Sequence, residues 1–269
     1  MKPTRIAPQQ LAKAFNQNVA TLDAQVSKFL QSSDASNTQA LRKATRRLRT
    51  SYSVLPKRLR KDAPIRRYVS ASRKLASATG QVRDLDTIVG WTSQVADARD
   101  RRSFALDLEK LRGSTLRGAV LEAKELRKTK MPPIEPEDLV RSKVEKRVEK
   151  VENGLSRRVD KEFEEFLSTQ EVDVMHALRK DSKRLRHLLE LTRNGEAPPL
   201  LGRLRSVQDD LGAIRDHDLI IDYLRSRVRL TSTRSLIREE IAKRHARLED
   251  FVTKNRGQGH LVPVSAKKP

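Results

Sequence analysis

Two segments of the chain place a row of basic side chains on a sequence whose leucines recur at helical spacing. The first is QALRKATRRLR at 39–49, and the second is HALRKDSKRLR at 176–186. Taken at 100° per residue, the basic side chains fall on one side of each helix and the leucines on another. Since residues 39–49 span about 15 Å at 1.5 Å per residue, each basic face suits the binding of a linear anion.

The basic residues of these two faces are the candidate binding residues of the protein. We call them the first basic stripe, with Arg42, Lys43, Arg46, Arg47 and Arg49, and the second basic stripe, with Arg179, Lys180, Lys183, Arg184 and Arg186. Gln39 precedes the first stripe at the position where His176 precedes the second.

Like charges stacked three and four residues apart on a helix destabilise it by roughly 0.2 to 0.5 kcal/mol per pair. An ordinary solvated helix therefore intersperses acidic residues, as VEKRVEKVENGL at 144–155 does. The two motif helices offer only Asp181 and Glu190. This pattern favours an external counterion, although pairing with acidic residues of neighbouring helices is the alternative for any single arginine.

The composition also indicates a polyanionic partner. Lysine and arginine number 57 against 35 acidic residues, which gives a formal net charge of +22. Such a charge destabilises a compact monomer by self-repulsion and usually meets nucleic acid, an anionic membrane or another phosphate polymer, unless it serves solubility alone. With only one Trp, three Tyr and six Phe, the chain is poorly provided for stacking bases.

The hydrophobic pattern predicts an all-α protein, because nearly every segment has a 3.6-residue period. We expect a first helical lobe at 8–129, a Pro-rich linker at 130–136, a second lobe at 137–255 and a disordered tail at 256–269. The expected helices cover 8–31, 37–55, 63–80, 82–97, 100–129, 137–168, 171–193, 197–212, 214–229 and 231–255. The chain has no cysteine, no membrane-length apolar run and no secretory leader pattern, which predicts a cytoplasmic protein without membrane insertion.

A second motif shows that the two lobes are a duplication. GQVRDLD at 80–86 matches GAIRDHD at 212–218, and the two copies follow the two basic helices in the same order. The motif residues are Arg83, Asp84 and Asp86 in the first lobe and Arg215, Asp216 and Asp218 in the second. Because each copy follows a glycine, we expect the aspartates near a helix start, where they cap the helix or orient motif arginines. Recruitment of Mg²⁺ or Ca²⁺ by these carboxylates is the alternative.

The pattern H-x-x-R-x-x-x-[KR]-R-x-R, followed by R-D-x-D and present twice in a basic helical chain, resembles the CHAD family, the conserved histidine α-helical domain. The resemblance covers about residues 8–255. It implies two pseudo-twofold-related helical bundles around a basic cavity, and binding of inorganic polyphosphate with association with polyphosphate granules. Gln39 departs from the family pattern, since a glutamine can donate a hydrogen bond to phosphate but cannot become cationic.

The sequence offers little for catalysis. RDHD at 215–218 contains the adjacent His and Asp of metal-dependent phosphohydrolases, but the further ligands of such enzymes are missing, and no Walker, H-E-x-x-H or G-x-S-x-G motif occurs. We therefore expect a non-catalytic polyphosphate-binding protein without cofactor or metal site. A general nucleic-acid binder is the first alternative and a phosphohydrolase the second.

Overall fold

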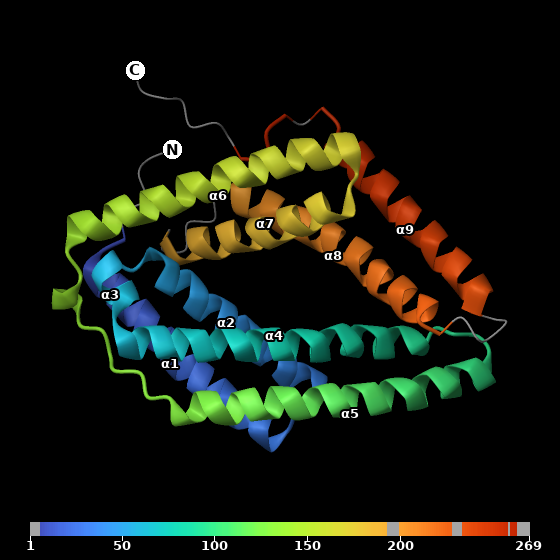
Figure 1. Ribbon diagram of the computed structural model, residues 1–269. Coiled ribbons are helices and arrows are strands. Elements are labelled where there is room, and N and C mark those ends of the chain that lie inside the picture. The colour runs from blue at the N-terminus through green and yellow to red at the C-terminus, as the bar shows by residue number, and fades with distance from the viewer. Residues whose placement is uncertain (1–5, 193–198, 228–232, 258, 263–269) are drawn as a thin grey trace. The chain divides into compact units, whose positions relative to one another are not determined.

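The computed structural model describes residues 6–192, 199–227, 233–257 and 259–262. Within these ranges the chain forms nine α-helices and one short 3-10 helix, and it contains no strand (Figure 1). The prediction of an all-α protein is confirmed.

The described residues form two compact units, which we call the first and the second unit. The first unit runs from Ala7 to Val144. Its helices are α1 (Pro8–Gln31), α2 (Ala35–Val54), α3 (Lys57–Lys61), α4 (Ala63–Thr92), α5 (Ala98–Lys128) and the 3-10 helix η1 (Pro136–Asp138). α1 packs against α2 and α5, α2 packs against α4, and α4 packs against α5. Each of the four long helices α1, α2, α4 and α5 therefore packs against two of the others.

The second unit contains the described residues after Val144, together with Ile6. Its helices are α6 (Arg141–Thr169, which begins just before the unit boundary), α7 (Val172–Thr192), α8 (Pro199–Arg225) and α9 (Thr233–Asn255). α8 packs against both α7 and α9. α6 contacts α9 through Phe163 and Phe166, whose ring centroids lie 6.3 Å and 5.6 Å from that of Phe251.

Two of the expected helix breaks are wrong. α4 continues through Gly80 to Thr92, and α8 continues through Gly212 to Arg225. A glycine inside a helix costs only about 0.5 to 1 kcal/mol relative to alanine, which packing of buried side chains on both sides outweighs. Val82, two residues after the first glycine, is fully buried. The R-D-x-D segments therefore lie inside long helices and not at helix starts.

The segments that flank the helices are also packed. The side-chain amide of Asn16 donates to the Ile134 carbonyl at 2.9 Å and accepts from the Ile134 N–H at 3.0 Å, which ties the Pro-rich segment to α1. Beyond α9, Leu261 and Val262 are buried, and the Val262 N–H donates to Asp160 Oδ1 at 2.7 Å. This part of the chain thus differs from the disordered tail expected there, whereas 263–269 lie outside the described residues.

An ion pair between the last two helices occurs in both units at equivalent positions. Arg112 Nε of α5 lies 2.7 Å from Asp86 Oδ1 of α4, and Arg244 Nε of α9 lies 2.5 Å from Asp218 Oδ1 of α8. In each unit the two residues are 26 positions apart, so the duplication extends to the last helix. Because both carboxylates are largely buried, each pair fixes the register of its two helices.

The same two helices are stabilised differently in the two units. In the second unit His217 Nδ1 lies 2.7 Å from Glu240 Oε2, and Lys243 Nζ lies 3.0 Å from Glu240 Oε1, with the Glu240 side chain 3% exposed. The equivalent residues of the first unit are three leucines, Leu85, Leu108 and Leu111. Three apolar positions of the first unit are thus occupied in the second unit by an ionic network around the buried Glu240.

Replacing this network with the leucines of the first unit should not destabilise the protein. Exchanging a buried ionic network for apolar residues is often neutral or stabilising, so we expect H217L/E240L/K243L to leave stability unchanged or raise it by up to about 2 kcal/mol. The single variant E240L should instead lose about 1 to 3 kcal/mol, since it leaves polar partners without their carboxylate. Urea denaturation measures both, and a triple variant less stable than E240L would contradict the equivalence of these layers.

Candidate functional site

The first basic stripe is positioned by the way α2 begins and by what it buries. Asp34 caps the helix, its Oδ1 accepting the Asn37 N–H at 2.7 Å. Leu41 and Leu48 are fully buried in the first unit. Burial of this leucine face leaves the opposite face, which carries the stripe, at the surface.

The second basic stripe has the same construction on α7. Leu178 and Leu185, the equivalents of Leu41 and Leu48, are also fully buried. The rotation of α7 about its axis is therefore fixed in the same way.

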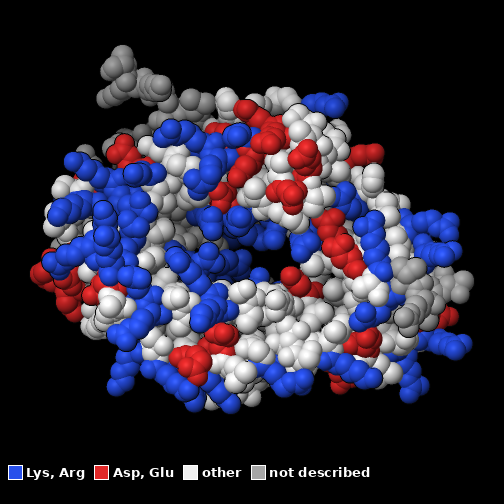
Figure 2. Space-filling view, in the orientation of Figure 1, with Lys and Arg blue, Asp and Glu red and all other residues white. Residues whose placement is uncertain are grey.

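The exposure of the stripe residues is the same in both copies. Three positions in each stripe are half-buried, namely Arg42, Arg46 and Arg49 in the first and Arg179, Lys183 and Arg186 in the second. The two flanking positions are exposed, namely Lys43 and Arg47 in the first and Lys180 and Arg184 in the second. Each stripe thus has an inner row of half-buried residues and an outer pair in solvent. Lysine and arginine form broad patches on the face shown in Figure 2.

Arg42 crosses from α2 onto α4. Its Nη1 donates to the Ala76 carbonyl at 3.5 Å, and a Cβ placed on Gly80 would lie 2.9 Å from the same nitrogen. Glycine at this position therefore makes room for the guanidinium. A methyl group placed on the equivalent Gly212 would meet no neighbouring atom within 4 Å, so the second unit lacks this close approach.

Asp181 ties the second stripe to α6. Its Oδ1 lies 2.9 Å from Arg184 Nη1, and its Oδ2 lies 2.6 Å from Arg158 Nε. The Asp181 residue is 4% exposed. Arg184 thus pairs with an acidic residue of its own helix, whereas the alternative considered from the sequence concerned acidic residues of neighbouring helices. Arg158 of α6 is a partner of Asp181 that the sequence pattern did not indicate.

The residues that precede the two stripes lie in different surroundings. Gln39 is exposed, whereas His176 is half-buried. Burial lowers the pKa of His176 below its ordinary value, and the nearby Arg215 and Arg179 lower it further, while Asp218 and Asp173 act in the opposite direction. His176 is therefore mainly neutral in the free protein at neutral pH.

The R-D-x-D residues do not cap helices, because they lie inside α4 and α8. Asp86 and Asp218 make their ion pairs with Arg112 and Arg244, and not with arginines of the stripes. Arg83, Asp84 and Arg215 are half-buried and Asp216 is exposed. The sequence did not identify Arg112 and Arg244, but the offset of 132 residues between the two R-D-x-D copies also relates these two arginines, so extending that register would have found them.

Clusters of metal-ligating side chains and membrane-spanning helices are absent from the described ranges. No group of three or more His, Asp or Glu side chains there is placed to hold a metal ion. None of the described helices has the length and apolar character needed to cross a bilayer.

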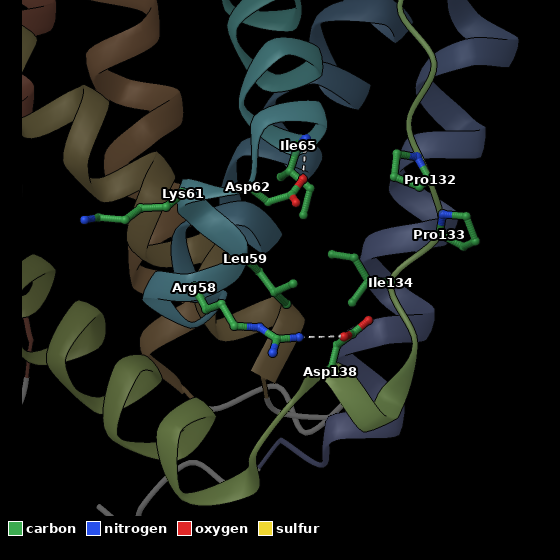
Figure 3. Close-up of a pocket in the computed structure, with 9 residues that line it drawn as sticks. All are labelled: Arg58, Leu59, Lys61, Asp62, Ile65, Pro132, Pro133, Ile134 and Asp138. Atoms are coloured by element: carbon green, nitrogen blue, oxygen red, sulfur yellow. Dashed lines mark hydrogen bonds and ion pairs between the residues drawn. The ribbon is translucent and has the colours of Figure 1, made fainter.

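A pocket of about 420 Å³ lies in the first unit, between the α3–α4 corner and the Pro-rich segment (Figure 3). Leu59 and Ile65 face Ile134 across it, and Arg58 Nη2 lies 3.0 Å from Asp138 Oδ1 at its edge. None of the stripe residues lines it. The pocket is therefore separate from the candidate anion-binding residues.

Fold and site together define an all-helical basic protein that carries the same charged helix in two repeated units. The family model of the CHAD domain matches residues 13–225, and the chain belongs to the CHAD domain family. The structure is similar to the crystal structure of the CHAD domain from the plant Ricinus communis, with a TM-score of 0.66 and 13% sequence identity over 96% of this chain and 94% of that chain. A comparison with curated proteins gave no match. The family resemblance seen in the sequence is thus confirmed, and the structural likeness supports the fold.

The two helix-interior glycines provide a test of the Arg42 placement. Alanine favours a helix interior over glycine by about 0.5 to 1 kcal/mol, so G212A, which meets no neighbouring atom, should stabilise the protein by that amount. G80A should gain clearly less, because its methyl group would displace the Arg42 guanidinium. Urea denaturation of both variants measures the difference, and an equal gain would contradict the close approach of Arg42 to α4.

Proposed function

We propose that this protein binds inorganic polyphosphate through the two basic stripes and does not catalyse a reaction on it. The observation that carries the proposal is the matching exposure of the stripes, each with a half-buried inner row and an exposed outer pair. Two helices that keep such a pattern across an internal repeat are expected to serve the same binding role. Membership of the CHAD family supports polyphosphate as the anion.

Polyphosphate suits this surface for chemical reasons. It carries negative charge along its whole length and has no apolar or aromatic part, so a row of cations meets all of its binding groups. Arginine and lysine in a row about 15 Å long can contact several successive phosphates. The half-buried inner row loses less side-chain entropy on binding than fully exposed side chains would.

Nucleic acid is the alternative partner, and the aromatic residues argue against a single-stranded one. Nine of the ten aromatic side chains are buried, and the tenth, Tyr52, lies beneath the guanidinium of Arg73 at 5.7 Å. Proteins that grip single strands stack bases on accessible aromatic rings. A phosphohydrolase remains the enzyme alternative, which phosphate release from tripolyphosphate with Mg²⁺ or Mn²⁺ would support.

Three further features belong to the proposal. The two units are proposed to be related by a pseudo-twofold axis around a basic cavity. The protein is proposed to reside in the cytoplasm and to associate there with polyphosphate granules. These features follow from the family resemblance and the composition.

Competition between anions tests the choice of partner. Labelled polyphosphate bound to the protein should resist displacement by an excess of duplex DNA or of RNA. The two competitors are used at the same concentration of phosphate groups. Because affinity for any polyanion falls with salt through counterion release, the comparison is made at one ionic strength. Equal displacement by nucleic acid would favour a general nucleic-acid binder.

Charge reversal tests whether polyphosphate binds through the stripe residues or is attracted only by the net positive charge of the protein. Arg42, Arg46, Arg179 and Lys183 are changed together to Glu, and the matched control changes Lys143, Lys146, Lys150 and Arg157, four exposed residues of α6, to Glu. The stripe variant should lose polyphosphate binding, whereas the control should lose only long-range attraction, which salt screens over about 8 Å. Circular dichroism checks that both variants are helical. Equal losses in the two variants would leave only a diffuse basic surface as the site.

A further inference from the structure

The two basic stripes differ in the acidic residues of their own helices. α2 contains neither aspartate nor glutamate, whereas α7 contains Asp173, Asp181 and Glu190. An offset of 137 residues relates the two helices, so Asp181 corresponds to Ala44 and Glu190 to Ser53. At these two positions the second helix thus carries a negative charge where the first carries none.

Asp181 forms an ion pair with Arg184, one of the two exposed cations of the second stripe. Its carboxylate holds Arg184 at 2.9 Å and Arg158 at 2.6 Å, although these two arginine side chains remain 46% and 52% exposed. The equivalent of Arg184 is Arg47, which is exposed and has Ala44 in place of the aspartate. An anion that binds Arg184 must compete with Asp181, and no carboxylate of α2 competes in the same way at Arg47.

Glu190 adds a second competing carboxylate. Its Oε1 lies 3.7 Å from Arg186 Nε and 3.6 Å from Arg205 Nη2, and its Oε2 lies 3.1 Å from His187 Nδ1. In the first unit the equivalent position holds the uncharged Ser53. Negative charge on α7 therefore lies beside two cations of the second stripe, Arg184 and Arg186.

The residue that precedes each stripe gives a further difference. His176 of α7 is half-buried, and the charges that act on it are those of Arg215 and Asp218 on α8 and of Arg179 and Asp173 on its own helix. On α6, Arg158 pairs with Asp181 and the charge of Glu162 also interacts with Asp181, while no α6 group is among the charges that shift the pKa of His176. A polyanion bound beside the neutral imidazole would favour its protonated form. Gln39 cannot take up a proton.

We propose that the two stripes are unequal sites for the polyanion, the first binding it more tightly at neutral pH, and the second gaining affinity when His176 is protonated. This inference rests on the proposed function and concerns the same residues. Asp181 and Glu190 weaken the second stripe by holding its arginines. His176 compensates for part of this loss at lower pH.

The direction of the pH dependence follows from the free and bound states of His176. In the free protein its pKa is lowered by burial and by the two arginines, and a bound polyanion raises it. Binding to the second stripe therefore takes up a proton, and its affinity rises as the pH falls through the pKa of the complex. The gain is complete once the pH lies below the pKa of the free protein. The first stripe has no such dependence.

Inactivating one stripe at a time tests the inequality. R46E/R47E leaves the second stripe intact, and the matched K183E/R184E leaves the first, with the same change of charge. Since each exposed charge contact has a modest effect, we expect polyphosphate affinity to fall about 2- to 30-fold further in R46E/R47E at neutral pH. Equal losses, or a larger loss in K183E/R184E, would overturn the inequality while leaving polyphosphate binding in place. If the parent protein did not bind polyphosphate, both proposals would fall.

Exchanging residues between the repeats tests the cause. In the R46E/R47E background, E190S or D181A should raise the affinity of the second stripe severalfold. In the K183E/R184E background, S53E should lower that of the first by a similar factor. Since Asp181 is buried, E190S is the primary variant, and circular dichroism shows whether D181A remains folded. Unchanged affinities in E190S and S53E would contradict the role of these carboxylates.

Isothermal titration calorimetry in buffers with different ionisation enthalpies measures how many protons are taken up on binding, and so tests the role of His176. The parent protein should take up a fraction of a proton per binding event over about pH 5 to 8, the range in which histidine titrates. H176Q, which carries the residue of the first unit, should abolish the uptake and still bind polyphosphate, and Q39H should increase it. Uptake that persists in H176Q would assign the proton to another group and overturn this part of the proposal.

Discussion

Burial of the leucine faces of α2 and α7 is the constraint on which the site depends. Leu41, Leu48, Leu178 and Leu185 are fully buried, so each helix can adopt only one rotation about its axis. Turning either helix would bury a guanidinium, whose desolvation costs several kcal/mol. The apolar core thus decides where the stripes point, and the repulsion between their cations is tolerated because it acts on a helix that packing already holds.

The two units share an ion pair between their last two helices and differ in the side chains around it. The pairs Asp86–Arg112 and Asp218–Arg244 join the last two helices at equivalent positions. Around them the first unit uses leucines where the second uses His217, Glu240 and Lys243. A buried ionic network is at best weakly stabilising compared with apolar packing, so the two units can differ at these positions with little effect on stability.

The two stripes also differ in the acidic residues beside their cations. The first stripe keeps its cations on a helix without acidic residues, whereas Asp181 and Glu190 bind cations of the second. A formal net charge of +22 would by itself attract any polyanion over a long range. The two stripes differ from a diffuse positive charge because their cations have a fixed spacing. The carboxylates of Asp181 and Glu190 make the second stripe different from the first, which otherwise matches it.

The sequence by itself determined the helical class, the division of α2 and α7 into leucine and basic faces, and the duplication. These features follow from a local period of 3.6 residues and from matching segments, neither of which requires knowledge of the packing. The two glycines misled the assignment of helix ends, because their local cost is small beside the packing of long helices that continue through them. Only the tertiary structure decided that Arg42 reaches Gly80, that Asp181 joins Arg158 to Arg184, and that Asp86 and Asp218 pair with the following helix. Such contacts depend on which helices are neighbours and in what register they pack, and the local sequence pattern of a single helix does not contain that information.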